Sequence, residues 1–172
     1  MNDEVSIFRL QAAWRECERN VYYLCQAQVL LNPILPMTGE IYADLNDDQV
    51  RILDQFILRF TKLQDAMGNH LFPAILTYLQ EPYEDRPMMD KLNRLEKLGY
   101  LEQAQTWQDI RNTRNKFAHD YPDDGEKNAA LINVASEVVR QLCLILTAIQ
   151  TKLQRDRPSL ILGNPLRVTN FS

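Results

Sequence analysis

Residues 125–155 read GEKNAALINVASEVVRQLCLILTAIQTKLQR, and this stretch indicates the fold class most directly. Apolar side chains recur in it at steps of three and four residues, which is the spacing of one face of an α-helix. The face is formed by Leu131, Val134, Val138, Leu142, Ile145, Ile149 and Leu153. The pattern predicts a helix from about Gly125 to Arg155, the longest in the chain.

Two further long helices are predicted in the N-terminal half. The first spans residues 5–31 and stops at Pro33, because a proline ring excludes the preceding residue from a helix. We expect a loop over residues 33–46 and then a second helix that Asp47 caps. The two apolar faces comprise Leu10, Trp14, Cys17, Val21, Leu24 and Gln28, and then Val50, Leu53, Ile57, Phe60, Leu63 and Met67.

Glycine and proline divide the middle of the chain into shorter pieces. We expect a kink or break near residues 68–73, with helix continuing to about Gln80. Another helix is predicted from near Glu102 to Pro122. A short helix is predicted between Gln80 and Glu102, and it ends at Gly99 in a left-handed cap. Its apolar face is formed by Met89, Leu92, Leu95 and Leu98.

The composition agrees with a helical protein. Of 172 residues, 45% are hydrophobic and 24% are charged, which is ordinary for a globular chain. The 5 glycines, and the lack of Asn-Gly or Asp-Gly turns between alternating apolar runs, argue against a β-sandwich or barrel. The sequence therefore predicts an all-α fold, an up-and-down helical bundle with four to five helices over residues 1–157. A non-periodic tail follows over residues 158–172.

Charge, cysteine usage and the terminal sequence indicate which partners and which cellular compartment to expect. The formal net charge is −4, which argues against a protein that coats nucleic acid by charge alone but allows a local basic site. Three scattered cysteines are predicted to be buried thiols in a reducing compartment. The acidic N-terminus lacks the apolar core of a signal peptide, and the apolar stretch at Leu142–Ile149 is short for a membrane span. We therefore expect a cytoplasmic protein with no membrane partner.

One segment concentrates polar groups that could carry chemistry. Residues 107–122 read WQDIRNTRNKFAHDYP, and within eleven positions they contain Arg111, Arg114, Asn115, Lys116, His119 and Tyr121. On a helix Asn115 and His119 share a face. Arg114 and His119 lie about 140° apart around the helix. Those two would meet one ligand only from a distorted helix end or with the help of a second subunit.

These residue types fit phosphodiester cleavage without a metal or cofactor. An imidazole such as that of His119 can take the proton of a ribose 2′-hydroxyl, because it titrates near neutrality. A guanidinium binds phosphate through two parallel bonds. No cluster with metal-ligand spacing is present, since His70 is far from His119 in sequence. The competing interpretation is structural, because Arg, Lys and His suit the negative end of any helix dipole. On that interpretation Trp107 is a core residue and His70 a cap or surface residue.

The string from Arg114 to Tyr121 reads R-N-x3-H-x-Y, which resembles the signature of the HEPN superfamily of small helical proteins, many of them RNases. The nearest forms are the HepT toxins and the nucleotidyltransferase substrate-binding proteins. Residues 59–66, RFTKLQDA, are similar to the R-F-x-x-x-x-[ED] helix of that group. The resemblance covers about residues 50–150. Met67 and Gly68 replace the aromatic residue and lysine that usually follow the acid.

The resemblance implies a HEPN-like bundle and a role for each residue. Arg114 and His119 would be catalytic, with Asn115 as a polar helper and Arg111 in support. Asp65 would orient Arg114 or His119 from the facing helix. A partner nucleotidyltransferase could add AMP to Tyr121. Members of the family are typically homodimers whose two motifs face one cleft.

The expected function is a metal-independent endoribonuclease that cleaves RNA as the toxin of a HEPN/nucleotidyltransferase toxin–antitoxin pair. Two alternatives stay open. The protein could be a non-catalytic adaptor that binds a nucleotidyltransferase and presents substrate or nucleotide to it. It could also be a structural bundle in which the motif is accidental.

Overall fold

The computed structural model describes residues 3–118, 124–163 and 166, and within them it contains helices and no strands. The predicted all-α bundle is therefore confirmed. The α-helices are α1 (Asp3–Leu31), α2 (Gly39–Ala43), α3 (Asp47–Ala66), α4 (Phe72–Tyr78), α5 (Met88–Lys97), α6 (Ala104–Lys116) and α7 (Gly125–Asp156). A 3-10 turn, Asn32–Ile34, follows α1, and a π-helix, Met67–Leu71, joins α3 to α4.

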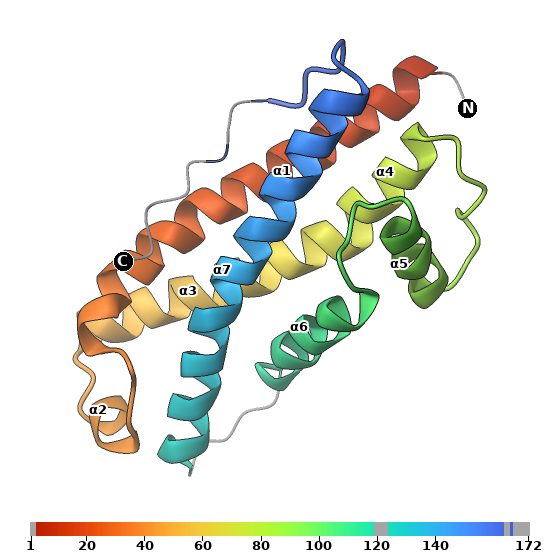
Figure 1. Cartoon of the computed structure of the whole chain (residues 1–172). Coiled ribbons are helices and arrows are strands. Elements are labelled where there is room, and N and C mark those ends of the chain that lie inside the picture. The colour runs from red at the N-terminus through yellow and green to blue at the C-terminus, as the bar shows by residue number, and fades with distance from the viewer. Residues whose placement is uncertain (1–2, 119–123, 164–165, 167–172) are drawn as a thin grey trace.

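The long helices form the frame of the bundle. Helices α3 and α4 follow one another as a single rod. Figure 1 shows α1 on one side of this rod, the shorter α5 and α6 on the other side, and α7 crossing in front. Arg59 of α3 contacts Asn20 of α1, whereas His70 contacts Glu16, so the two helices run in opposite directions. Helix α6 contacts α3, α5 and α7. Helix α6, which carries the first part of the polar segment 107–122, is therefore held against both α3 and α7.

Large aromatic side chains fill the core between these elements. Phe72 packs edge-on against Trp107 with ring centroids 4.6 Å apart, which ties α4 to α6. Phe60 meets Phe117 in the same way at 5.6 Å, which ties α3 to the end of α6. Phe60 is fully buried, and truncating such a side chain to alanine costs roughly 3–5 kcal/mol. Both ends of α6 are therefore fixed by packing.

Helix α7 begins where the sequence predicts and extends one residue further, and four of the seven residues of the predicted stripe are buried. Val134 of the predicted stripe is 46% exposed, and Leu131 and Ile145 are only half-buried. The buried side chains are Ala129, Ile132, Ala135, Val138, Val139, Leu142, Cys143, Leu146, Ile149, Gln150 and Leu153. Because α7 is apolar over more than half of its circumference, periodicity alone could not show which sector the other helices cover.

Two predictions about the start of α3 are wrong. Asn46, not Asp47, caps the helix: its Oδ1 accepts the Gln49 backbone N–H at 2.9 Å, and Gln49 Oε1 accepts the Asn46 N–H at 3.0 Å. Residues 33–46 are not only loop, because they include α2. The described residues thus contain seven α-helices rather than four to five. Helix α2 was not predicted, whereas α4 is the helical continuation that was expected beyond the break.

The kink or break expected near residues 68–73 is a π-helix that continues directly into α4. Gly68 lies in it, and a β-carbon at this position would be 3.2 Å from Cζ2 of Trp107. The close approach of the indole explains the absence of a side chain there. A π-turn widens the helix by one residue, and such turns are frequent at functional sites.

The C-terminal stretch packs back onto α1 after α7 ends. Leu160 and Leu162 are buried in the core, and Gln11 Nε2 donates to the Ile161 carbonyl at 2.7 Å. The contacts are made by the first residues of the predicted tail. No helix follows Asp156 among the described residues.

Helix α7 also contains an 18-residue window that is apolar enough to cross a membrane by length and composition. Of that window, 44% is buried inside the bundle. This is weak evidence for a membrane span, because the core helix of a soluble protein passes the same test. The three cysteines are buried, as predicted, and burial raises the pKa of the Cys17 thiol well above its ordinary value.

Candidate functional site

The polar motif meets α3 through an ion pair between Arg114 and Asp65. Arg114 Nε donates to Asp65 Oδ1 at 3.0 Å, and Arg114 Nη2 donates to Asp65 Oδ2 at 2.8 Å. The arginine side chain is 27% exposed and the aspartate 40%. Two parallel bonds fix the plane of the guanidinium as well as its position. This is the contact from the facing helix that the resemblance implies for Asp65.

The pair lies in the wall of a small polar pocket of about 250 Å³. The pocket is bounded by α3, the π-helix, the start of α5, and α6. Its lining residues are Gln64, Asp65, Gly68, Asn69, Met88, Trp107, Arg111, Arg114 and Asn115. Four of these were predicted as site residues from the motif and its resemblance, and the fold brings all four together.

The charges in the pocket favour an anionic ligand. Asp65 neutralises one positive charge and occupies two N–H groups of Arg114, and the remaining N–H groups of that guanidinium can still donate. Arg111 lies about one turn earlier on α6 and is exposed. Among the described residues it makes no ion pair with a carboxylate. The pocket therefore combines one oriented guanidinium with a second cation, which suits a phosphate group.

His119 and Tyr121 lie outside the described residues. The described part of the motif shows that α6 ends at Lys116, earlier than the predicted end at Pro122. Phe117 and Ala118 form a turn, in which the Ala118 N–H donates to the Asn115 carbonyl at 3.1 Å. An ideal helix therefore does not extend from Arg114 through the motif.

Five lining residues were not predicted as site residues, namely Gln64, Gly68, Asn69, Met88 and Trp107. Gln64 is only 4% exposed, although it falls outside the predicted apolar stripe of its helix. Asn69 belongs to the π-helix, whose wide turn is not visible in the periodicity. Trp107 is a core residue, as predicted, and contributes to the pocket wall as well. A polar residue beside the acid of the family motif was the only signal that could have pointed to Gln64.

A second cavity lies on the other side of the π-helix. It has a volume of about 380 Å³ between α1, α4, α5 and the loop that precedes α5. His70 Nδ1 lies 2.8 Å from Glu16 Oε2 at its edge, and the histidine side chain is 58% exposed. Phe8 stands at the rim with 64% of its surface exposed. His70 is thus a surface residue, as predicted, with a carboxylate partner that the sequence did not indicate.

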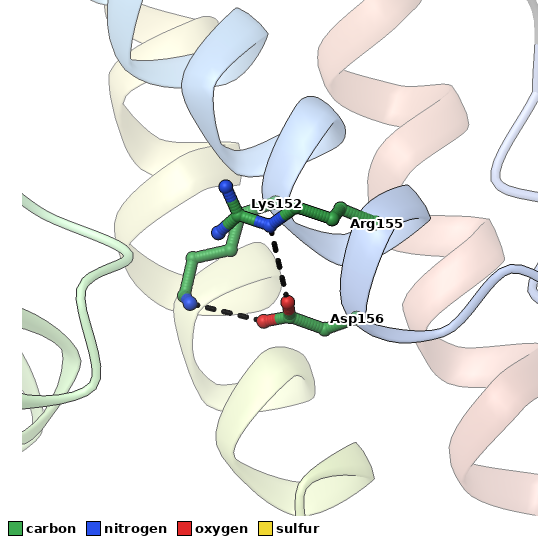
Figure 2. A network of polar contacts seen from close by, with 3 residues as sticks. All are labelled: Lys152, Arg155 and Asp156. Atoms are coloured by element: carbon green, nitrogen blue, oxygen red, sulfur yellow. Dashed lines mark hydrogen bonds and ion pairs between the residues drawn. The ribbon is translucent and has the colours of Figure 1, made fainter.

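Other ion pairs of the bundle lie away from the polar pocket. Figure 2 shows Asp156 at the end of α7, where Lys152 Nζ donates to it at 2.9 Å and Arg155 Nε at 3.4 Å. These contacts lower the pKa of Asp156, and the hydrogen bond from Lys152 makes the largest contribution. Arg94 of α5 holds Glu81 by two bonds of 2.8 Å. Neither group lines the polar pocket.

Within the described residues, no three His, Cys, Asp or Glu side chains gather in a way that could hold a metal ion. Comparison of the chain with protein-family models, with curated proteins and with solved structures finds no match in any of the three.

Proposed function

We propose that the protein is a metal-independent endoribonuclease whose active site is the polar pocket at the end of α6. The observation that carries the proposal is the forked Arg114–Asp65 pair, with Arg111 and Asn115 beside it. A guanidinium held in one plane is suited to the charge that develops on a phosphate during transfer. The resemblance of the motif to that of HEPN RNases supports the same interpretation.

The reaction in this proposal needs only groups of the chain and the substrate. His119 takes the proton of a ribose 2′-hydroxyl, and the 2′-oxygen forms a bond to the adjacent phosphorus. The bond from phosphorus to the 5′-oxygen breaks, and the imidazolium of His119 gives its proton to that leaving oxygen. Arg114 and Arg111 stabilise the additional negative charge on the phosphoryl oxygens. The products are a 2′,3′-cyclic phosphate and a 5′-hydroxyl end, and DNA is not cleaved because it lacks the nucleophile.

In the same proposal the protein acts in the cytoplasm as a toxin, and its antitoxin is a nucleotidyltransferase that modifies Tyr121. Two chains form a homodimer with a composite pocket, as the resemblance implies. These parts of the proposal depend on the resemblance. A single 20.1 kDa species in sedimentation at micromolar concentration would contradict the dimer.

A non-catalytic adaptor is the second candidate, and the same ion pair favours it. Because Asp65 already neutralises Arg114, the pair could serve only to hold α3 and α6 together, while Arg111 binds the phosphate of a nucleotide. The two candidates differ in turnover. An adaptor would bind a nucleotide or a nucleotidyltransferase without cleaving RNA.

The test is RNA cleavage by the full chain in buffer containing EDTA. Arg114→Ala should lower the cleavage rate about 10²–10³-fold, and Arg114→Lys should not restore it, because an ammonium cannot make two parallel bonds. Arg94→Ala is the matched control, since it removes another forked arginine–carboxylate pair away from the pocket. Equal cleavage by Arg114→Ala and Arg94→Ala would refute the proposal, as would activity that requires added Mg²⁺.

A further inference from the structure

A second group of arginines gathers around Tyr23 on α1. Arg59 of α3 lies over the tyrosine ring, with its Cζ 4.5 Å from the ring centroid. Arg19, one turn earlier on α1, lies over the same ring at 5.6 Å. Arg59 Nη1 also donates to Oδ1 of the buried Asn20 at 3.1 Å. Both guanidiniums therefore contact the same aromatic ring, and that of Arg59 is also held by an amide.

This cluster differs from the other arginine contacts in its charge. Arg51, Arg94 and Arg114 each face a carboxylate. Within the described part of the chain, neither Arg19 nor Arg59 forms an ion pair, so their two positive charges are not neutralised. An aromatic ring attracts a cation through its quadrupole but carries no net charge. A bound anion would supply the negative charge that the ring does not, through charge-assisted hydrogen bonds from the guanidiniums.

One member of the cluster, Arg59, lies on α3, the helix that also supplies Asp65 to the candidate pocket. Arg59 and Asp65 are six residues apart on α3, which corresponds to roughly 9 Å along the helix axis. Lys62 lies midway and is exposed. Residues three apart are rotated by about 60°, so these three positions turn gradually from the α1 side to the α6 side. A single extended strand could touch the cluster, Lys62 and the pocket in that order.

We propose that Arg19, Tyr23 and Arg59 form a second phosphate-binding site for the backbone of the RNA strand that is cleaved at Arg114. This proposal rests on the proposed function, since it gives the same substrate a second contact. Tyr23 positions the two guanidiniums, and their outward N–H groups bind the phosphate. Because the contact is to the backbone, it adds affinity and sets the path of the strand without selecting a base sequence.

The experiment measures binding of a fluorescein-labelled single-stranded oligodeoxynucleotide, which carries phosphates but cannot be cleaved. Fluorescence anisotropy gives the dissociation constant at several salt concentrations. The Arg19→Gln/Arg59→Gln double variant should bind at least ~10-fold more weakly at low salt. The slope of log K against log salt should fall by about 0.7 for each phosphate that the variant no longer binds. Tyr23→Leu should also weaken binding, although it removes no charge.

Arg51→Gln is the matched control, because it removes one positive charge from the same helix where a carboxylate already faces it. Melting temperatures of all variants exclude unfolding as the cause of weaker binding. Binding by the double variant with the affinity and salt slope of Arg51→Gln would overturn the proposal. A loss of binding confined to the double variant and Tyr23→Leu would support it.

Cleavage of the matching oligoribonucleotide, measured in parallel, separates this proposal from the proposed function. If the wild type cleaves RNA and the double variant binds and cleaves equally well, the second site is wrong and the nuclease stands. If the wild type binds the oligodeoxynucleotide through the cluster but cleaves nothing, the phosphate site stands and the nuclease is wrong. Absence of binding by the wild type would overturn the second site directly.

Discussion

Arg114 and Asp65 are 49 positions apart in sequence, yet they form a forked ion pair with N–O distances of 3.0 and 2.8 Å. The aspartate comes from the last turn of α3 and the arginine from the last turn of α6. The pair therefore connects the frame of the bundle to the segment that carries the motif. Its partly exposed position leaves the guanidinium accessible from the pocket.

Replacing Asp65 should distinguish its role in orienting Arg114 from its role in stabilising the fold. In Asp65→Ala, Arg114 loses both bonds, so RNA cleavage should fall about 10-fold or more. The free energy of unfolding should fall by only about 0.5–1 kcal/mol, because the pair is partly exposed to solvent. Urea denaturation and a cleavage assay on the same preparation measure both quantities. Full cleavage with reduced stability would instead assign the pair a purely structural role.

The two histidines of the chain provide a matched comparison. His119→Ala should lower cleavage about 10²–10⁴-fold, the usual contribution of a general acid or base. His70→Ala should leave cleavage unchanged, because His70 contacts Glu16 at the other cavity. Both variants should melt close to the wild type. A cleavage rate that falls equally in the two variants would contradict the assignment of His119.

Gly68→Ala should lower the stability of the fold, because the added methyl group would press on Trp107 in the wall of the pocket. The added methyl group would lie 3.2 Å from Trp107, which is buried and packed against Phe72 and has little freedom to move. Overpacking of this kind usually costs about 1–3 kcal/mol, and the better helix propensity of alanine recovers up to about 1 kcal/mol. We expect a net loss of about 1 kcal/mol in thermal or urea unfolding. An unchanged or increased stability would show that the indole can shift.

The Glu81–Arg94 pair should make part of the stability depend on pH. The hydrogen bond from Arg94 lowers the pKa of Glu81 below its ordinary value of 4.5. The pair therefore stabilises the folded state above that pH, and its contribution is lost as the pH falls through the lower folded-state pKa. Urea unfolding of the wild type and Arg94→Ala should differ at pH 7 and converge in strong acid. A difference that stays constant down to that acid range would show that Glu81 is not the coupled group.

Features that are local in a helix were predictable from the residues. The first helix and α7 were predicted to within two residues at each end, because apolar spacing and Pro33 act over one or two turns. The left-handed cap at Gly99 is confirmed by its φ of 82°. The cap of α3 was placed one residue late because Asn46 and Asp47 are both good capping residues, and only the backbone direction entering the helix selects between them. A kink or break was expected near Gly68, but the sequence did not indicate that it would be a π-helix.

From the residues alone follow the all-α class, the position of the long helices and the segment in which the polar side chains concentrate. Which residues meet depends on the folded chain: Asp65 lies against Arg114, Val134 of α7 faces solvent, and Arg59 lies on the ring of Tyr23. The difference arises because spacing of three and four residues defines a face of one helix. Contacts between faces depend on how whole helices cross, which is settled by packing the complete core.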